Sequence, residues 1–468
     1  MIAVANRLPG VLGTAGRLAV KFDLLRGALA LLIFLNVSRI HQHFKWMAMF
    51  RPALVLAALA AIYAFVNPWA LSTRGLFMTR EARLIAAFSA LACLSAVFGL
   101  SLGSSATFIL SSYSKVVLAA VLLIAAIRTA RDLYTFVWAY VAGCGALAYL
   151  SIFVFGLSKA GSQAERLSDL YTFDANDVGL VMLVGLPLTI LALQASKGLA
   201  KVAAAVILVG IGITLARTGS RGAFVGLLVT GIALLVMLRT VPLWQRASFV
   251  VITAVSLVFA APKGYWDQMS TVLRPKEDYN WSSTEGRREV AKRGISYMLS
   301  YPVFGLGINN FWRAECIDPV SIKVRVHQAS QGIRCTAPHN SYVQAGAELG
   351  IPGLTLWILL VFGSIPAMLR LRRRLPEQWI RGDPEQRFLY LCTMYFAVAM
   401  TGFAVGSFFV SFAWVDIVYT IAALMAGLGV SVAQRLATAD ADQQLSMVPV
   451  GSRGRAPTYR PSVLRISQ

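Results

Sequence analysis

The sequence has little charge and few of the residue patterns that usually carry catalysis. Only 14% of its 468 residues are charged and 57% are hydrophobic, whereas soluble chains carry about 25% charged residues. This shortage of polar surface excludes a set of water-facing domains, and the hydrophobic content excludes a disordered chain. The sequence also lacks paired carboxylates, glycine-rich nucleotide loops, nucleophile elbows and acidic clusters with the spacing of a metal cage. We therefore expect no metal and no cofactor.

Long apolar runs are the main feature that the sequence does have. A membrane helix needs about 20 mainly apolar residues, and twelve stretches come close to this length. These stretches are residues 25–40, 47–67, 83–102, 106–127, 133–157, 177–195, 199–216, 222–239, 245–262, 341–369, 386–411 and 414–433. The tenth contains Gly350, Pro352 and Gly353, which predict a break or kink. The sequence therefore predicts an all-α polytopic membrane protein with about twelve transmembrane helices.

The net charge of +22 first suggests a nucleic-acid-binding protein. The basic residues, however, are spread thinly between the apolar runs, so we expect no nucleic-acid partner. If the N-terminus lies in the cytoplasm, 24 of the 43 Lys and Arg residues fall on the cytoplasmic side, and 11 of the other 19 belong to one long segment, 263–339. Because long loops are exempt from the positive-inside rule, this distribution favours cytoplasmic termini. The basic run at 370–374 is the strongest anchor against anionic membrane lipid.

This topology divides the chain into four parts. Residues 1–262 hold the first nine helices, and residues 340–433 hold the last three. Residues 434–468 are polar, and we expect them to form a disordered cytoplasmic tail. Residues 263–339 form one large loop on the exported side. Helical spacing over 284–300 predicts that this loop is partly helical and caps the membrane helices.

Two of the five cysteines, Cys316 and Cys335, fall in the exported loop. In an oxidising compartment we expect such a pair to form a disulfide. The alternative is two unrelated thiols. A zinc site is disfavoured because no further ligands stand at finger-like spacing.

A histidine stands where the exported loop meets the tenth apolar stretch. Asn340 or Ser341 can cap the helix that begins there, which leaves His339 at the helix N-terminus. The positive end of the helix dipole disfavours the imidazolium form, so the ring should be neutral and available as a general base. The alternative is a histidine at the membrane surface with no role in chemistry.

Arginines on the exported side form the second group of candidates. Arg217 and Arg221 lie in a tight turn with two glycines between the seventh and eighth stretches, and Arg287 and Arg288 lie in the large loop. Arginine binds phosphate oxygens in a bidentate manner, although contact with lipid headgroups would also explain the pair in the turn. Together with His339, these residues indicate metal-independent transfer from a membrane-borne, phosphate-activated donor.

These pieces, in this order, resemble the O-antigen ligase family, whose domain also occurs in O-antigen polymerases and protein O-oligosaccharyltransferases. The matching residues are Ser220-Arg221-Gly222, Gly286-Arg287 with Arg288, Pro302 with Gly305, Gly307 and Phe311, His339-Asn340-Ser341-Tyr342, and Gly350 with Gly353. The resemblance covers about residues 175–355, and the remainder only by architecture. The loop departs from the family pattern, because two arginines are adjacent, and Val290 and Ala291 stand where the family usually has a Trp a few residues after one arginine. This departure leaves open whether Arg287 or Arg288 is the functional residue.

The resemblance implies a glycosyltransferase of the bacterial inner membrane whose active site faces the periplasm. Its donor would be a glycan linked to undecaprenyl pyrophosphate, and the acceptor of a ligase is a sugar hydroxyl of the lipid A–core. His339 would accept the proton of the acceptor. Arg221 and either Arg287 or Arg288 would hold the pyrophosphate, with Arg217 as a further contact.

Two other functions stay open on the sequence alone. A polymerase or a protein O-oligosaccharyltransferase would use the same chemistry with a different acceptor. A transporter of lipid-linked glycans would need ionisable residues at mid-membrane depth or repeated halves with broken helices. Lys115 is the main residue of that kind, and we find no two-fold repeat, so the sequence disfavours a transporter.

Overall fold

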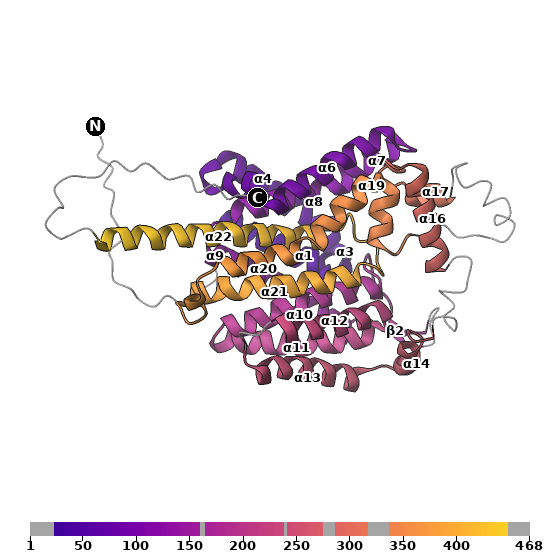
Figure 1. The fold of residues 1–468 in the computed structure, drawn as a ribbon. Coiled ribbons are helices and arrows are strands. Elements are labelled where there is room, and N and C mark those ends of the chain that lie inside the picture. The colour runs from indigo at the N-terminus through magenta and orange to yellow at the C-terminus, as the bar shows by residue number, and fades with distance from the viewer. Residues whose placement is uncertain (1–22, 160–163, 238–240, 275–285, 317–336, 448–468) are drawn as a thin grey trace.

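A chain that crosses a lipid bilayer must satisfy its backbone hydrogen bonds within itself, which favours helices. The computed structural model describes residues 23–159, 164–237, 241–274, 286–316 and 337–447, and these are almost entirely helical (Figure 1). The elements up to the tenth predicted stretch are α1 (Leu24–Ser38), α2 (Ile40–His43), α3 (Lys45–Met49), α4 (Pro52–Val66), η1 (Pro68–Ala70), α5 (Thr73–Met78), α6 (Arg80–Phe98), α7 (Leu102–Phe108), η2 (Ile109–Tyr113), α8 (Ser114–Ala126), α9 (Ala130–Phe153), β1 (Leu157–Ser158), β2 (Arg166–Leu167), α10 (Ala175–Ala195), α11 (Gly198–Thr218), α12 (Arg221–Met237), α13 (Leu243–Ala260), α14 (Tyr265–Ser270), α16 (Arg287–Ser300) and α17 (Phe311–Cys316). The remaining elements are α19 (Ser341–Val361), α20 (Ser364–Arg374), η5 (Glu377–Ile380), α21 (Pro384–Gly406) and α22 (Asp416–Met447).

Ten helices in the described part of the chain are long and apolar enough to cross a membrane. Each of the twelve predicted stretches falls on a helix, but α1 and α12, with 15 and 17 residues, are shorter than the other ten. The protein is therefore an all-α, multi-pass membrane protein, as the sequence predicts.

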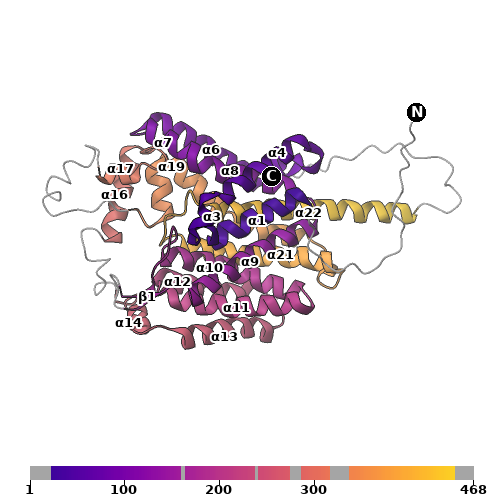
Figure 2. The same ribbon diagram turned by 180° about the vertical axis from the view of Figure 1, so that it is seen from behind.

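Three helices form the centre of the bundle. In the most apolar window of α10, 83% of the residues are buried inside the protein, and the corresponding shares are 89% for α21 and 78% for α22. The share is only 11% for α13, which runs along the edge of the bundle beside α11 (Figures 1 and 2). The exposed apolar surface of α13 is therefore suited to contact lipid.

The tenth predicted helix breaks where the sequence predicts. Gly350 interrupts α19 with φ 72° and ψ −168°, and only glycine adopts this conformation readily. The break leaves backbone carbonyls without helical partners, and a segment from 302 to 307 supplies replacements. The N–H groups of Leu306 and Gly307 donate to the carbonyls of Ala347 (2.9 Å) and Glu348 (3.0 Å). The predicted kink is thus confirmed. The carbonyls that it exposes also bind the chain that follows α16.

Part of the large predicted loop forms helices at one end of the bundle, which we call the cap end. Helices α14, α16 and α17 lie there (Figures 1 and 2). The predicted helix at 284–300 is confirmed as α16. It packs against α19, where Gly294 leaves room for the side chain of Val343.

The boundary of the C-terminal tail differs from the prediction. Residues 434–447 continue α22, whereas the sequence predicted a disordered segment from 434. This stretch is rich in Ala, Gln and Leu, which extend a helix readily once it has formed. Residues 448–468 lie outside the described residues.

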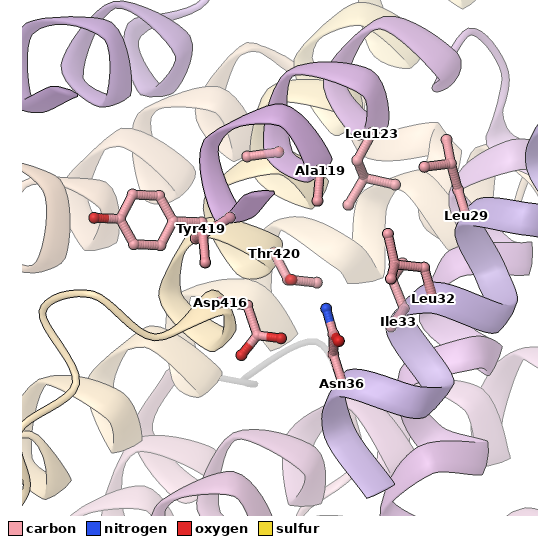
Figure 3. A pocket seen from close by; sticks show the side chains of 11 residues that line it. Leu29, Leu32, Ile33, Asn36, Ala119, Leu123, Asp416, Tyr419 and Thr420 are labelled. Carbon is pink, nitrogen blue, oxygen red and sulfur yellow. The ribbon is translucent and has the colours of Figure 1, made fainter. Parts of the chain in front are cut away.

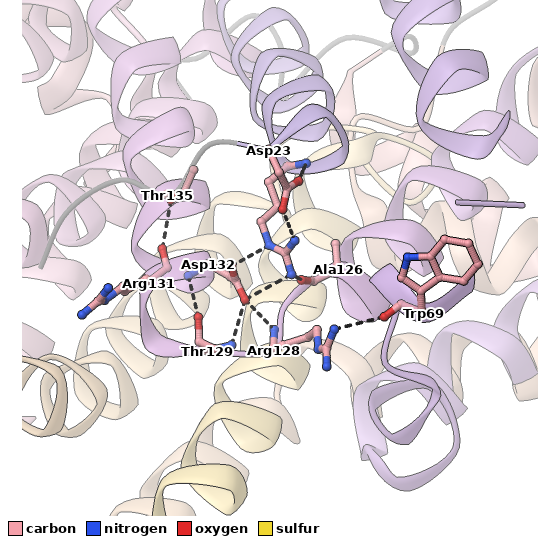
Figure 4. Close-up of polar contacts among 9 residues, drawn as sticks. Asp23, Trp69, Ala126, Arg128, Thr129, Arg131, Asp132 and Thr135 are labelled. Atoms are coloured by element: carbon pink, nitrogen blue, oxygen red, sulfur yellow. Dashed lines mark hydrogen bonds and ion pairs between the residues drawn. The ribbon is translucent and has the colours of Figure 1, made fainter. Parts of the chain in front are cut away.

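A buried ion pair joins two helices, α1 and α9 (Figure 4). The Arg26 guanidinium lies 2.5 Å from the carboxylate of Asp132 and also donates to the carbonyl of Ala126 (3.0 Å). Asp132 accepts hydrogen bonds from the backbone N–H groups of Arg128 (3.0 Å) and Thr129 (2.9 Å). The pair fixes the start of α1 to the start of α9.

This arrangement makes a prediction about stability. Asp132→Ala should lower the free energy of unfolding by about 3–5 kcal/mol, because it removes the buried one of the two carboxylates that pair with Arg26 and leaves only the more exposed Asp23. The matched control is Glu385→Ala, which removes the more exposed ion pair with Arg131 (2.9 Å) and should cost about 0–1 kcal/mol. Denaturant or thermal unfolding in detergent measures both. Equal losses in the two variants would contradict the structural role of Arg26.

Candidate active site

His339 directly precedes the N-cap of α19. The Asn340 side chain accepts hydrogen bonds from the backbone N–H groups of Tyr342 (2.9 Å) and Val343 (3.1 Å), as the sequence predicts. His339 has φ 44°, a left-handed conformation that is uncommon for a residue with a side chain and tends to occur at functional sites. The contacts of the helix cap therefore hold His339 in a conformation that it would rarely adopt alone.

The connection between α21 and α22, which we call the 407–414 turn, anchors the start of α19. The Ser341 backbone N–H donates to the carbonyl of Ser407 (2.8 Å). The Ser341 hydroxyl donates to the carbonyl of Val410 (2.8 Å) and accepts from the N–H of Phe412 (2.9 Å). Ser341 is fully buried, so these bonds are shielded from water and fix the segment that carries His339.

The same turn packs against the start of α12. A Cβ at Gly222 would lie 2.5 Å from the ring of Phe409, so a larger residue would push the turn away. Ser220 caps α12 by accepting from the N–H of Ala223 (3.2 Å). The two motifs that lie about 120 residues apart in the sequence thus share one support, the 407–414 turn.

Arg221 follows this cap and reaches α14. Its Nη1 donates to the Thr271 hydroxyl (2.9 Å). The side chain of Gln268, also on α14, donates to the carbonyl of Gly219 (2.7 Å). Arg221 is half-buried, and its predicted contact with a phosphate stays a prediction.

Arg217 has a different environment from Arg221. Its Nε donates to the carbonyl of Ser151 (2.8 Å) and its Nη2 to that of Phe155 (3.2 Å). Two of its donor nitrogens are therefore hydrogen-bonded to backbone carbonyls at the end of α9. Its predicted contact with a phosphate stays a prediction, and the structure assigns it a second role in joining α9 to α11.

The electrostatic surroundings of His339 favour a neutral ring. Burial lowers the pKa of the imidazole below its ordinary value, the positive charge of Arg287 lowers this pKa further, and the charge of Asp174 acts in the opposite direction. The sequence predicted a neutral ring from the helix dipole. The structure adds burial and Arg287 as causes, and it brings His339 and Arg287 together.

The two adjacent arginines of α16 differ in exposure. Arg287 is half-buried at the first turn of α16, and Arg288 is exposed. The charge of Arg287 acts on His339, whereas Arg288 has no such effect among the causes of the shift. Arg287 is therefore the better placed of the two for chemistry that involves His339.

A family model described as O-antigen ligase matches residues 203–358. The chain carries an O-antigen ligase domain. A search of the curated proteins found no match to the chain. The matched region contains α16 and the start of α19. All the predicted site residues lie within it: His339, the four candidate arginines, and Cys316 and Cys335.

Asp174 lies outside the O-antigen ligase domain, and it was not among the site residues predicted from the sequence. It caps α10 by accepting from the N–H groups of Asn176 (2.6 Å) and Asp177 (2.9 Å). Its charge also raises the pKa of His339. The sequence signal was a capping pattern before an apolar run. Such a pattern predicts where a helix starts, but it does not predict that Asp174 lies near a histidine far along the chain.

Arg39 connects this region to the core of the bundle. Its guanidinium lies 4.6 Å from the centroid of the Phe173 ring and 3.1 Å from the Asp416 carboxylate. Asp416 also lines a small pocket between α1, α8 and α22, together with Asn36, Thr420 and mainly apolar side chains (Figure 3). None of the predicted site residues lines this pocket, so we do not assign the chemistry to it.

The predicted disulfide falls partly within the described residues. Cys316, at the end of α17, is disulfide-bonded. Its expected partner, Cys335, lies outside the described residues. Within the described residues, no three His, Cys, Asp or Glu side chains are grouped as metal ligands would be.

The position of Arg287 makes a prediction about His339. Arg287→Gln should raise the pKa of His339, because it removes a positive charge that disfavours the imidazolium form. Diethylpyrocarbonate modifies neutral imidazole, so the pH midpoint of modification, followed on the His339 peptide by mass spectrometry, reports this pKa. We expect the midpoint to move to higher pH in Arg287→Gln and to stay in place in the matched variant Arg288→Gln. Equal midpoints in all three proteins would show that the charge of Arg287 does not lower the pKa of His339.

Proposed function

We propose that the protein is an O-antigen ligase that moves polysaccharide from undecaprenyl pyrophosphate to a sugar hydroxyl of the lipid A–core. The O-antigen ligase domain supports the reaction class. The observation that carries the proposal is a half-buried histidine whose pKa is lowered by burial and by the charge of Arg287 of α16. A neutral imidazole can accept a proton, and an arginine can bind pyrophosphate.

The proposed step uses His339 as general base. It accepts the proton of the acceptor hydroxyl while the acceptor oxygen attacks the anomeric carbon of the donor glycan. The bond between that carbon and the pyrophosphate oxygen breaks, and undecaprenyl pyrophosphate leaves as an anion. Arg221 and Arg287 would stabilise the charge that develops on the leaving group, where electrostatic help has the largest effect. Arg288 and Arg217 are further candidate contacts of the donor.

We further propose that the cap end faces the periplasm and both termini face the cytoplasm. The distribution of Lys and Arg supports this orientation. The basic end of α20, with Arg372, Arg373 and Arg374 in its last turn, would then lie against the anionic cytoplasmic surface of the bacterial inner membrane.

Reconstitution tests the acceptor. The purified protein in proteoliposomes, given an undecaprenyl-pyrophosphate-linked polysaccharide and rough lipopolysaccharide, should produce lipopolysaccharide that carries the polysaccharide. Joining of donor units to one another, with the lipid A–core left unmodified, would show a polymerase instead. Transfer to added protein would show a protein O-oligosaccharyltransferase.

Two changes test the mechanism. His339→Ala should abolish transfer, a loss of at least about 100-fold, while the variant elutes as a folded protein from a sizing column. Transfer by the wild-type protein should persist in EDTA, because His339 and the arginines supply the proton acceptor and the charge stabilisation. Near-wild-type turnover of His339→Ala, or loss of transfer in EDTA, would refute the proposed mechanism.

A further inference from the structure

A buried carboxylate on α19 has no part in the proposed reaction step. Glu348 is 2% exposed, and both of its oxygens accept hydrogen bonds. Oε2 accepts from the backbone N–H of Asn309 (2.8 Å) and from the indole Nε1 of Trp414 (2.6 Å), and Oε1 accepts from the N–H of Phe311 (3.2 Å). Burying a charged group is costly unless it is fully hydrogen-bonded. These three donors offset part of that cost, and they come from two segments other than α19.

The backbone of the same residue binds the chain that leads to α17. The Glu348 carbonyl accepts from the N–H of Gly307 (3.0 Å) and from the Ser95 hydroxyl (2.7 Å). Gly305 has φ 68°, and a Cβ there would lie 2.4 Å from the carbonyl carbon of Glu348. The approach is therefore close enough to require glycine, and Glu348 contacts this chain through both its backbone and its side chain.

A second buried carboxylate carries the connection on to α16. Phe311 is the first residue of α17. Glu315, four residues later, is 5% exposed and forms an ion pair with Arg293 of α16 (2.7 Å). It also accepts from the Tyr297 hydroxyl (2.8 Å). Besides the direct packing of Gly294 against Val343, a second connection from α19 to α16 thus runs through Glu348, α17 and Glu315.

The two ends of this path carry the chemistry of the site. Helix α19 begins two residues after His339, and α16 begins with Arg287. Glu348 is buried among its three donors, so it cannot reach a substrate. Its carboxylate is placed instead to set how α17, and with it α16, sits against α19.

We propose that Glu348 is a positioning residue that holds Arg287 of α16 in register with His339, which directly precedes the N-cap of α19. This inference rests on the proposed function for its effect on turnover. Its structural part, the distance between Arg287 and His339, does not depend on that function. The two can therefore be tested separately.

The first experiment uses the titration of His339 in the full-length protein. If Glu348→Gln lets α17 and α16 shift, the charge of Arg287 moves away and the midpoint of diethylpyrocarbonate modification of the His339 peptide should move to higher pH. The matched control is Glu289→Gln, which changes an exposed carboxylate of α16 that pairs with Lys292 (2.8 Å) and should leave the midpoint in place. In an Arg287→Gln background, Glu348→Gln should add no further shift, because the charge that it displaces is already gone.

The second experiment measures transfer. Glu348→Gln should lower kcat by about tenfold to a hundredfold, as expected when a catalytic group is displaced by a small distance, with little change in KM for the donor. Glu289→Gln should keep the wild-type kcat. If Glu348→Gln fails to fold, Trp414→Phe removes only one of the three donors and should shift the midpoint and kcat in the same directions by smaller amounts.

The outcomes separate the two ideas. A folded Glu348→Gln protein with the wild-type midpoint and kcat would overturn the positioning role, as would a further shift in the Arg287→Gln background. If the wild-type protein transfers no glycan to any acceptor, the proposed function fails. The midpoint of His339 would still test the positioning role in that case.

Discussion

The arrangement of the site depends on a helix that breaks within the membrane bundle. In lipid, a backbone carbonyl that loses its helical partner must find another one. The break at Gly350 frees carbonyls of α19, and the chain after α16 supplies the N–H groups that bind them. A straight helix would present no such acceptors. The break therefore determines where the cap can dock, and the docking places the arginine-bearing α16 beside the helix that follows His339.

A second constraint comes from outside the O-antigen ligase domain. The 407–414 turn follows the end of the matched region by about 50 residues, yet it contacts both the cap of α12 and the start of α19. Phe409 fits against Gly222, and the backbone around Phe412 binds Ser341. The short motifs of the domain could not keep their spacing without this turn. The domain thus contains the residues of the proposed reaction, while part of their support lies in the connection between the last two membrane helices.

The sequence predicted those features that follow from local physics. Twelve apolar stretches predicted twelve helices because lipid leaves few alternatives to a helix, and Gly350 predicted the kink because its neighbours disfavour a regular helix. The neutral state of His339 was predicted from the helix dipole, whereas the structure shows burial and the charge of Arg287 as its causes. Burial and Arg287 depend on the packing of α16 against α19, which local patterns do not encode. The surroundings of Asp174, Glu348 and the 407–414 turn were missed for the same reason, since they depend on contacts between distant parts of the chain.

The charges around His339 also bear on the order of events in the proposed reaction. Arg287 lowers the pKa of His339, which keeps the ring neutral but also makes it a weaker base. A bound pyrophosphate would bring negative charge to Arg287 and offset its effect, so the pKa of His339 would rise when the donor is in place. Asp174, whose charge acts in the same direction, would then help to stabilise the imidazolium that forms as the acceptor loses its proton. On this basis the base would reach its full strength only with the donor bound, and an acceptor hydroxyl would be activated only when a glycan is ready for transfer.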